Sequence, residues 1–198
     1  MTLVVSPRQE VRFERGFKTW SENTAVSIRH RLKLKDVDPL PPRQLAEDRK
    51  VLVWYPRDVP GLSAPAVRHL CSPVGDEWSA VTVCAGGQEV VVLNPSHSDA
   101  RQASDLMHEL AHLIRGHVPA QVVVLPEAGI GIRSYNDLEE AEANWLAGCL
   151  LLPRPALASC AARNLSTSAI CDHYGVSGDL VKYRMNVTGV ARQFGTRT

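Results

Sequence analysis

The sequence lacks any long apolar segment. No run approaches the about 18 consecutive apolar residues of a membrane-spanning helix, and no positively charged leader with an apolar core opens the chain. It also lacks a C-x-x-C pair, and its five cysteines are odd in number and widely spread, which argues against a disulfide framework and against a thiolate zinc site. We therefore expect a cytoplasmic protein that has no membrane partner and whose cysteines are small buried side chains.

The sequence has little net charge as well. Its formal charge is +1 at pH 7, so no overall excess of basic residues favours a nucleic-acid partner. We find no internal repeat and no low-complexity segment. With 198 residues, of which 44% are apolar, the chain is long enough to bury a full core, and we expect one compact domain with a small appendage.

What the chain does contain is an H-E-x-x-H motif, His108 to His112, in a segment with helical apolar spacing from Asp99 to His117. In a chain of this composition the chance expectation of such a motif is about 0.01. Residues four apart lie on one face of a helix, so both imidazoles can reach one metal ion while Glu109 lies beside them. The opposite face, which is needed to bury the helix, is formed by Ala103, Leu106, Met107, Leu110, Leu113, Ile114 and His117.

The motif suits zinc chemistry. A catalytic zinc site has three protein ligands and leaves a position for water, whose pKa the ion lowers toward about 7. Glu109 is then placed to take the proton as the water attacks a carbonyl. The sequence therefore predicts zinc-dependent hydrolysis of an amide, with His108 and His112 as metal ligands and Glu109 as catalytic base. The alternative is a helix in which the two histidines only pack and Glu109 is solvated.

The third ligand decides the subclass of site. A metzincin has Gly seven and His ten residues after the first His, where this chain has Arg115 and Val118. We interpret His117 as a helix-end residue near the C-terminal carbonyls rather than as a ligand. The metzincin pattern is therefore absent, and the third ligand has to come from elsewhere.

A second predicted helix, Leu138 to Leu152, follows an Asn136-x-x-Glu139 capping box and carries three carboxylates near its start. A carboxylate from a second helix completes a His₂Glu zinc site, and we choose Glu140 for this role. Asn144, one turn further on, is the candidate outer partner that hydrogen-bonds a ligating imidazole. The neighbouring carboxylates are turned away by about 100° and 200°, so Glu139 and Glu142 are predicted to be solvated.

The two motifs, H-E-L-A-H and E-A-E-A-N-W-L-A-G-C-L-L-L-P, resemble those of the ImmA/IrrE family of metallo-endopeptidases. The resemblance implies a gluzincin-like zinc site with the same three ligands and the same base that we chose from the spacing. It also implies a narrow protein substrate, a helix-turn-helix transcriptional repressor whose cleavage releases genes of a phage, another mobile element or a stress response. Gly148 and Cys149 depart from the family pattern, in which helix formers are commoner at these positions.

The rest of the chain predicts an α+β, zincin-like fold, with a small three-stranded antiparallel sheet packed against helices that include the H-E-x-x-H helix. A metallopeptidase domain is expected over residues 1–155, with a helical subdomain over 156–198. The elements expected before the motif are helices over Pro7–Arg31, Pro42–Asp48 and Pro65–Leu70, a strand over Val51–Tyr55, and a hairpin with strands Trp78–Cys84 and Glu89–Leu93 joined at Ala85–Gln88.

Between the two metal helices, residues 118–137 are either a loop over the cleft or an ordinary connector. A second donor to the oxyanion of the reaction is expected, and the sequence does not choose among Tyr135, His173, Tyr183 and Arg184.

The C-terminal subdomain resembles a helix-turn-helix, with helices over Ser166–His173 and Gly178–Asn186 and a turn at Gly175. Arg184 stands where such motifs usually bury an aliphatic residue. We therefore favour a packing or substrate-docking role over direct DNA binding through residues 166–186. Two rival functions remain: an antirepressor without catalysis, in which zinc is structural, and a DNA-binding regulator.

Overall fold

The computed structural model describes residues 12–72, 78–117, 123–125, 129–131 and 136–195. The helices are α1 (Phe17–Arg31), α2 (Pro42–Asp48), the 3₁₀ turn η1 (Pro56–Asp58), α3 (Ala64–Leu70), α4 (Asp99–Arg115), α5 (Asp137–Leu151), α6 (Arg154–Ala162), α7 (Thr167–Tyr174), α8 (Gly178–Val187) and α9 (Val190–Phe194). The strands are β1 (Leu52–Trp54), β2 (Ala80–Ala85), β3 (Gln88–Leu93), β4 (Val123–Leu125) and β5 (Gly129–Gly131). Most elements begin and end within a few residues of their predicted positions. The first helix is shorter than predicted, because Gly16 precedes its first turn; residues 7–11 lie outside the described ranges.

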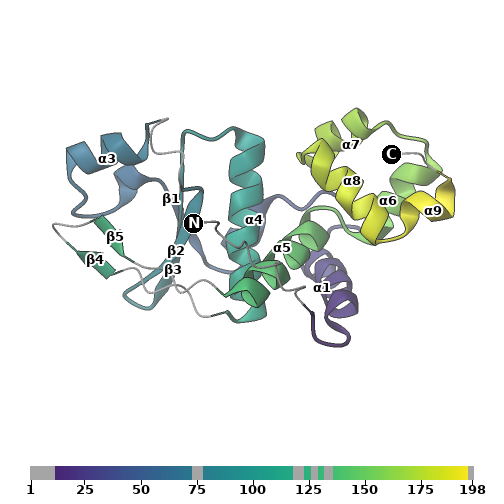
Figure 1. Cartoon of the computed structure of the whole chain (residues 1–198), viewed down its shortest axis with the longest axis horizontal. Helices are drawn as coiled ribbons and strands as arrows, with labels where there is room; N and C mark the ends of the chain where they lie inside the picture. Colours follow the sequence, from purple (N-terminus) through teal and green to yellow (C-terminus); the bar gives the residue numbers. More distant parts are fainter. Residues whose placement is uncertain (1–11, 73–77, 118–122, 126–128, 132–135, 196–198) are drawn as a thin grey trace, which may run out of the picture.

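Helix α4 lies at the centre of the molecule, with β2 and β3 on one side and α5 on the other (Figure 1). Its buried residues face both neighbours, because the apolar stripe is wide enough to cover more than one contact. Helix α1 packs against the far side of α5. Helices α6 to α9 gather at the opposite end of the molecule from the sheet (Figure 1). Side chains on different faces of α4 therefore reach the sheet or α5, so this helix can place functional groups next to both.

The sheet is mixed, so the predicted antiparallel arrangement is wrong for one strand. The order is β1-β3-β2: β3 pairs antiparallel with β2 but parallel with β1, in the register Leu52 opposite Val90. The hairpin β2-β3 was predictable from the Gly86-Gly87 pair, because a tight two-residue turn requires positive φ at both of its central residues. Both glycines have positive φ in the structure. Strand β1 enters the sheet through a long connection that includes α3, and hydrophobic patterning does not show its direction.

The C-terminal end of α5 is tied to the rest of the protein by two buried arginines. Arg29 of α1 donates from Nη2 to the Leu150 carbonyl at 2.7 Å, and Arg184 of α8 donates from Nε to the Leu152 carbonyl at 3.1 Å. Arg184 also pairs through Nη2 with Glu22 at 2.5 Å. Burial lowers the pKa of Arg29 to about 10, so this side chain stays protonated at neutral pH. The two cations satisfy carbonyls that a helix end leaves without partners and oppose its negative dipole end.

Arg184 explains two departures that the sequence left open. A Cβ on Gly148 would lie 3.1 Å from the Arg184 Cδ, so the absence of a side chain at 148 leaves room for the arginine. Arg184 is fully buried, and its position is therefore one of packing. The buried guanidinium is not available to a DNA phosphate. If Arg184→Ala lowered DNA affinity, the loss would therefore report a change in folding rather than a lost DNA contact.

The C-terminal helices share one core with the rest of the chain. The predicted boundary at residue 155 falls just after the break between α5 and α6. A single cluster of buried side chains nevertheless joins α1, α4 and α5 to Leu157, Ile170 and Met185 of the later helices. The predicted helix, turn and helix are present as α7, Gly175 with φ 64°, and α8. We conclude that residues 156–195 contribute to the same core as α5.

Three other expectations concern membrane-spanning segments, the cysteines and residues 118–137. In the part of the chain that is described, no single helix has the length and apolar character to cross a membrane; only α5 and α6 taken together, bent by 45°, reach that threshold. Cys149 and Cys160 are buried as expected, but Cys84 is exposed. Within residues 118–137, β4 and β5 pair antiparallel, whereas 118–122, 126–128 and 132–135 lie outside the described residues.

We expect Arg184→Ala to lower the free energy of unfolding by about 3 kcal/mol, because it leaves the Leu152 carbonyl and Glu22 without their cation in a largely buried place. Urea denaturation followed by circular dichroism measures this. Lys182→Ala, on the exposed side of the same helix, is the control and should change stability by no more than about 0.5 kcal/mol. Equal stability of the two variants would show that the arginine does not hold α5.

Candidate metal centre

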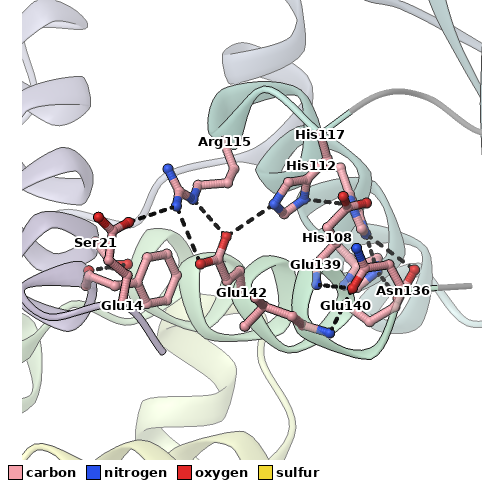
Figure 2. Close-up of polar contacts among 12 residues, drawn as sticks. Glu14, Ser21, His108, His112, Arg115, His117, Asn136, Glu139, Glu140 and Glu142 are labelled. Carbon is pink, nitrogen blue, oxygen red and sulfur yellow. Dashed lines mark hydrogen bonds and ion pairs between the residues drawn. The ribbon is translucent and has the colours of Figure 1, made fainter. Parts of the chain in front are cut away.

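Helix α4 carries the H-E-x-x-H motif between two well-formed ends. Ser98 caps its start by accepting a hydrogen bond from the Arg101 N–H, and Gly116, with φ 81°, ends it in the left-handed conformation. Between these ends His108 and His112 lie one turn apart, with ring centroids 4.7 Å from each other. Both rings point toward α5 (Figure 2), as the four-residue spacing predicts.

Glu140 meets these rings from the first turn of α5. That turn is set by Asn136, whose side chain accepts hydrogen bonds from the N–H groups of Leu138 and Glu139. The Glu140 Oε2 lies 3.2 Å from the His108 Nε2, and its Oε1 lies 3.6 Å from the His112 Nε2. The structure therefore brings together the three residues that the sequence proposed as ligands.

The size of this cluster fits a zinc ion. One ligand atom from each of His108, His112 and Glu140 lies within 4.8 Å of the others, and the two Nε2 atoms are 3.1 Å apart. Ligands about 2.0–2.2 Å from a tetrahedral zinc are separated by about 3.3–3.6 Å, close to the distance between the two Nε2 atoms and to the 3.2 Å between Glu140 Oε2 and His108 Nε2. Two imidazole nitrogens and one carboxylate oxygen are also the donor set of a His₂Glu zinc site. The residues present thus fit the metal that the sequence predicts.

Glu109 lies in α4 beside the first ligand but contacts the sheet. It is 4% exposed, and its Oε2 accepts a hydrogen bond of 2.5 Å from the Thr82 hydroxyl of β2. Strand β2 is an outer strand of the three-stranded sheet. The carboxylate of Glu109 is therefore held by the strand next to the helix. No pattern in the sequence indicates this contact, because it depends on how β2 packs.

His117 has a role that the sequence did not indicate. It is a helix-end residue, as interpreted, since its backbone N–H bonds the His112 carbonyl at 3.0 Å. Its side chain, however, reaches back to the site: the His117 Nδ1 lies 3.0 Å from the His112 Nδ1, and its Nε2 lies 3.1 Å from the Glu142 Oε2. His117 therefore contacts a proposed ligand without being part of the three-residue cluster.

Glu142 was predicted to be solvated, and this is wrong. It is 5% exposed and accepts hydrogen bonds from Arg115 Nε at 2.7 Å and Arg115 Nη2 at 3.3 Å, in addition to its contact with His117. Burial alone would raise the pKa of Glu142, but the hydrogen bonds from Arg115 and His117 outweigh it and lower the pKa below its usual value. The helical wheel placed Glu142 correctly away from Glu140 but could not show that a cation from α4 covers it.

Other predicted site residues do not join the cluster. The Asn144 side chain is exposed, and its role as the outer partner of a ligand stays a prediction. Of the oxyanion candidates, Arg184 is buried at the end of α5, Tyr183 packs exposed against Trp145, and His173 stacks edge-on against Tyr174. The fourth candidate, Tyr135, lies outside the described residues.

A family comparison agrees with this site. The Peptidase_M78 family model, described as the IrrE N-terminal-like domain, matches residues 67–186. The chain belongs to this family. The matched part is more than half of the chain and contains the whole cluster on α4 and α5, whereas α1, α2 and β1 precede it. The resemblance to the ImmA/IrrE proteins is thereby confirmed, and membership of the IrrE N-terminal-like family indicates a metallopeptidase-like or regulatory role.

A comparison with solved structures gives a likeness in fold. The chain resembles the solved structure of a Mycobacterium tuberculosis transcriptional regulator with a TM-score of 0.50 and 11% sequence identity. The alignment covers 88% of this chain and 48% of that one, so the chain spans about half the length of the structure it resembles. At this identity the likeness concerns the fold alone. No curated protein matches the chain.

Proposed function

We propose that this protein is a zinc-dependent endopeptidase that hydrolyses a peptide bond in a specific intracellular protein. The observation that carries the proposal is the convergence of His108, His112 and Glu140 on α4 and α5, with the buried Glu109 beside them. A three-ligand set leaves a coordination position open, which is the arrangement of catalytic rather than structural zinc sites. The metal, when bound, would supply Lewis acidity and make water nucleophilic near neutral pH.

The residues of the chain would bind the ion and transfer the proton. His108, His112 and Glu140 would hold the ion. Glu109 would accept a proton from the attacking water and pass it to the leaving amine, as a general base and then a general acid. The hydrogen bond from Thr82 to Oε2 of Glu109 would hold the carboxylate in place for this exchange.

The sheet suggests how a substrate would bind. Strand β2 contacts Glu109 through Thr82 and pairs with β3 on one side only among the described strands. An extended peptide can add to such an edge by backbone hydrogen bonds, largely independently of its side chains. Binding at β2 would bring a peptide carbonyl to the side of α4 that carries the base.

The proposed substrate is a helix-turn-helix transcriptional repressor, cleavage of which would release the genes it controls. The support is membership of the IrrE N-terminal-like family together with the resemblance on which the sequence prediction rested. We further propose that the enzyme acts in the cytoplasm and binds no membrane. The second candidate is an antirepressor that binds the same partner without cutting it; it is favoured by the helix-turn-helix arrangement of α7 and α8.

The test is metal removal from the purified protein, incubated with a helix-turn-helix repressor as substrate. We expect about one zinc per chain, cleavage of the repressor at a defined bond, loss of cleavage after chelation by 1,10-phenanthroline, and recovery when zinc is added back. Mass spectrometry of the products identifies the bond. Cleavage that continues at the same rate in metal-free protein would contradict the proposal.

A further inference from the structure

We propose that His117 is a positioning residue of the metal centre, which holds the His112 ring through Nδ1 and is itself held by Glu142 and Arg115. The proposal rests on the proposed role of His112 as a zinc ligand. Figure 2 shows the row of side chains from His112 through His117, Glu142 and Arg115 to Glu14. Each link in this row is a contact between described residues.

The direction of each hydrogen bond follows from the ligand. If the Nε2 of His112 presents its lone pair to the metal, its Nδ1 carries the hydrogen. The His117 Nδ1, 3.0 Å away, must then accept, which places the hydrogen of His117 on Nε2. That nitrogen lies 3.1 Å from the Glu142 carboxylate, an acceptor only. One choice of tautomer at His112 therefore satisfies both contacts of His117.

The chain is folded so that His117 can make these contacts. Gly116, with φ 81°, turns the backbone back on itself immediately after α4. This left-handed position returns residue 117 to the helix end, where its N–H bonds the His112 carbonyl and its side chain is 8% exposed. A residue with a Cβ would adopt this conformation only with strain. Gly116 thus supports the contact between the two imidazoles.

The outer end of the row is held firmly. Arg115 makes two hydrogen bonds with Glu142, a paired geometry that fixes the carboxylate in direction as well as in position. The Arg115 guanidinium carbon also lies 5.5 Å from the ring centroids of Phe17 and Trp20 of α1. Its contact with Glu14, 3.5 Å long and largely exposed, adds little. Helix α1, which precedes the part matched by the family, is thereby connected to the metal centre.

Such an outer partner has a measurable effect on metal binding. A ligating imidazole usually donates its second N–H to a carboxylate, a carbonyl or water, and losing that partner commonly weakens metal affinity by about 10–100-fold. Here the partner is a second imidazole, which is rigid and has one acceptor and one donor. Replacing it should therefore disturb the orientation of His112 without removing any ligand.

The experiment compares zinc affinities by chelator competition in the full-length protein. His117→Leu removes both contacts and should weaken zinc binding by about 10–100-fold. His117→Gln offers a carbonyl to His112 and an amide to Glu142, and should recover most of the loss. His69→Leu changes an exposed histidine; it is the control and should bind zinc as the wild type does. Wild-type affinity in His117→Leu, or no recovery in His117→Gln, would overturn the proposal.

A second measurement uses the unmodified protein. In zinc-loaded protein with ¹⁵N-labelled histidine, the N–H···N bond should give a scalar coupling between Nδ1 of His112 and Nδ1 of His117. A His117 ring that only packs against its neighbours, without this hydrogen bond, does not produce the coupling. A His112 ring that carries its hydrogen on Nε2 would refute the proposal. Zinc bound normally but no peptide cleaved would refute the peptidase function and leave the positioning role intact, so the two failures are distinct.

Discussion

Glu109→Gln is expected to reduce the turnover of the protein substrate by about 100- to 10,000-fold while zinc stays at about one per chain. The amide has the shape of the carboxylate, and its oxygen can still accept the hydrogen bond from Thr82. It cannot take a proton from water at neutral pH. The variant therefore removes the proposed base without disturbing the fold or the three proposed ligands. Product formation at saturating substrate, with zinc measured on the same sample, tests this.

The same variant separates the two candidate functions. An antirepressor without catalysis would release the repressor from DNA equally well as the wild type and as Glu109→Gln, whereas a peptidase would lose the effect in the variant. Glu47→Gln, an exposed carboxylate on α2, is the matched control and should keep full activity. Cleavage by Glu109→Gln at more than about a tenth of the wild-type rate would exclude Glu109 as the base, because general base catalysis contributes at least about 100-fold.

The sequence predicted those parts of the site that depend on local spacing. His108 and His112 share a face because four residues make about one helical turn, and this holds wherever the helix packs. Glu140 could be selected from three nearby carboxylates because its neighbours are rotated by known angles on α5. These inferences needed only the assumption that both segments are helical, and apolar periodicity supported that assumption.

The parts that were missed depend on contacts between distant segments. Glu142 is buried because Arg115 comes from another helix, and a helical wheel of α5 alone contains no such cation. His117 reaches His112 only through the left-handed turn at Gly116, although a Gly-His pair directly after a metal-binding helix is a signal that can be sought. Asn144 was chosen from its spacing on α5; it is exposed, and its role as an outer partner stays a prediction.

The direction of β1 and the burial of Arg184 were missed for the same reason. A three-residue strand has too few side chains for its alternation to indicate its partner. An arginine in a predicted helix is normally assigned to the surface, and only the carbonyls at the end of α5, with Glu22 from α1, give it a buried site. In both cases the contacting segment, β3 for β1 and α1 with the end of α5 for Arg184, lies far away in the sequence.

Glu140→Ala is the other change with a large expected effect: zinc affinity should fall by well over about 100-fold, more than the loss of an outer partner causes. The only carboxylate among the three proposed ligands is removed, so the net charge that offsets the ion is lost with it. Chelator competition measures the affinity, and metal content after gel filtration measures retention. Glu139→Ala is a close control, since the residue is adjacent, carries the same charge and lies in the same turn of α5.

The contrast between these neighbours tests the ligand choice more sharply than either result alone. Both substitutions remove one negative charge from the start of α5 and weaken its favourable interaction with the helix dipole by a similar amount. A general electrostatic or helix-stability effect would therefore appear in both variants. The geometry places Glu140 within 3.6 Å of the two histidine Nε2 atoms, so only its removal should release zinc. Retention of zinc by Glu140→Ala together with its loss from Glu139→Ala would show that helix α5 presents a different carboxylate to the metal.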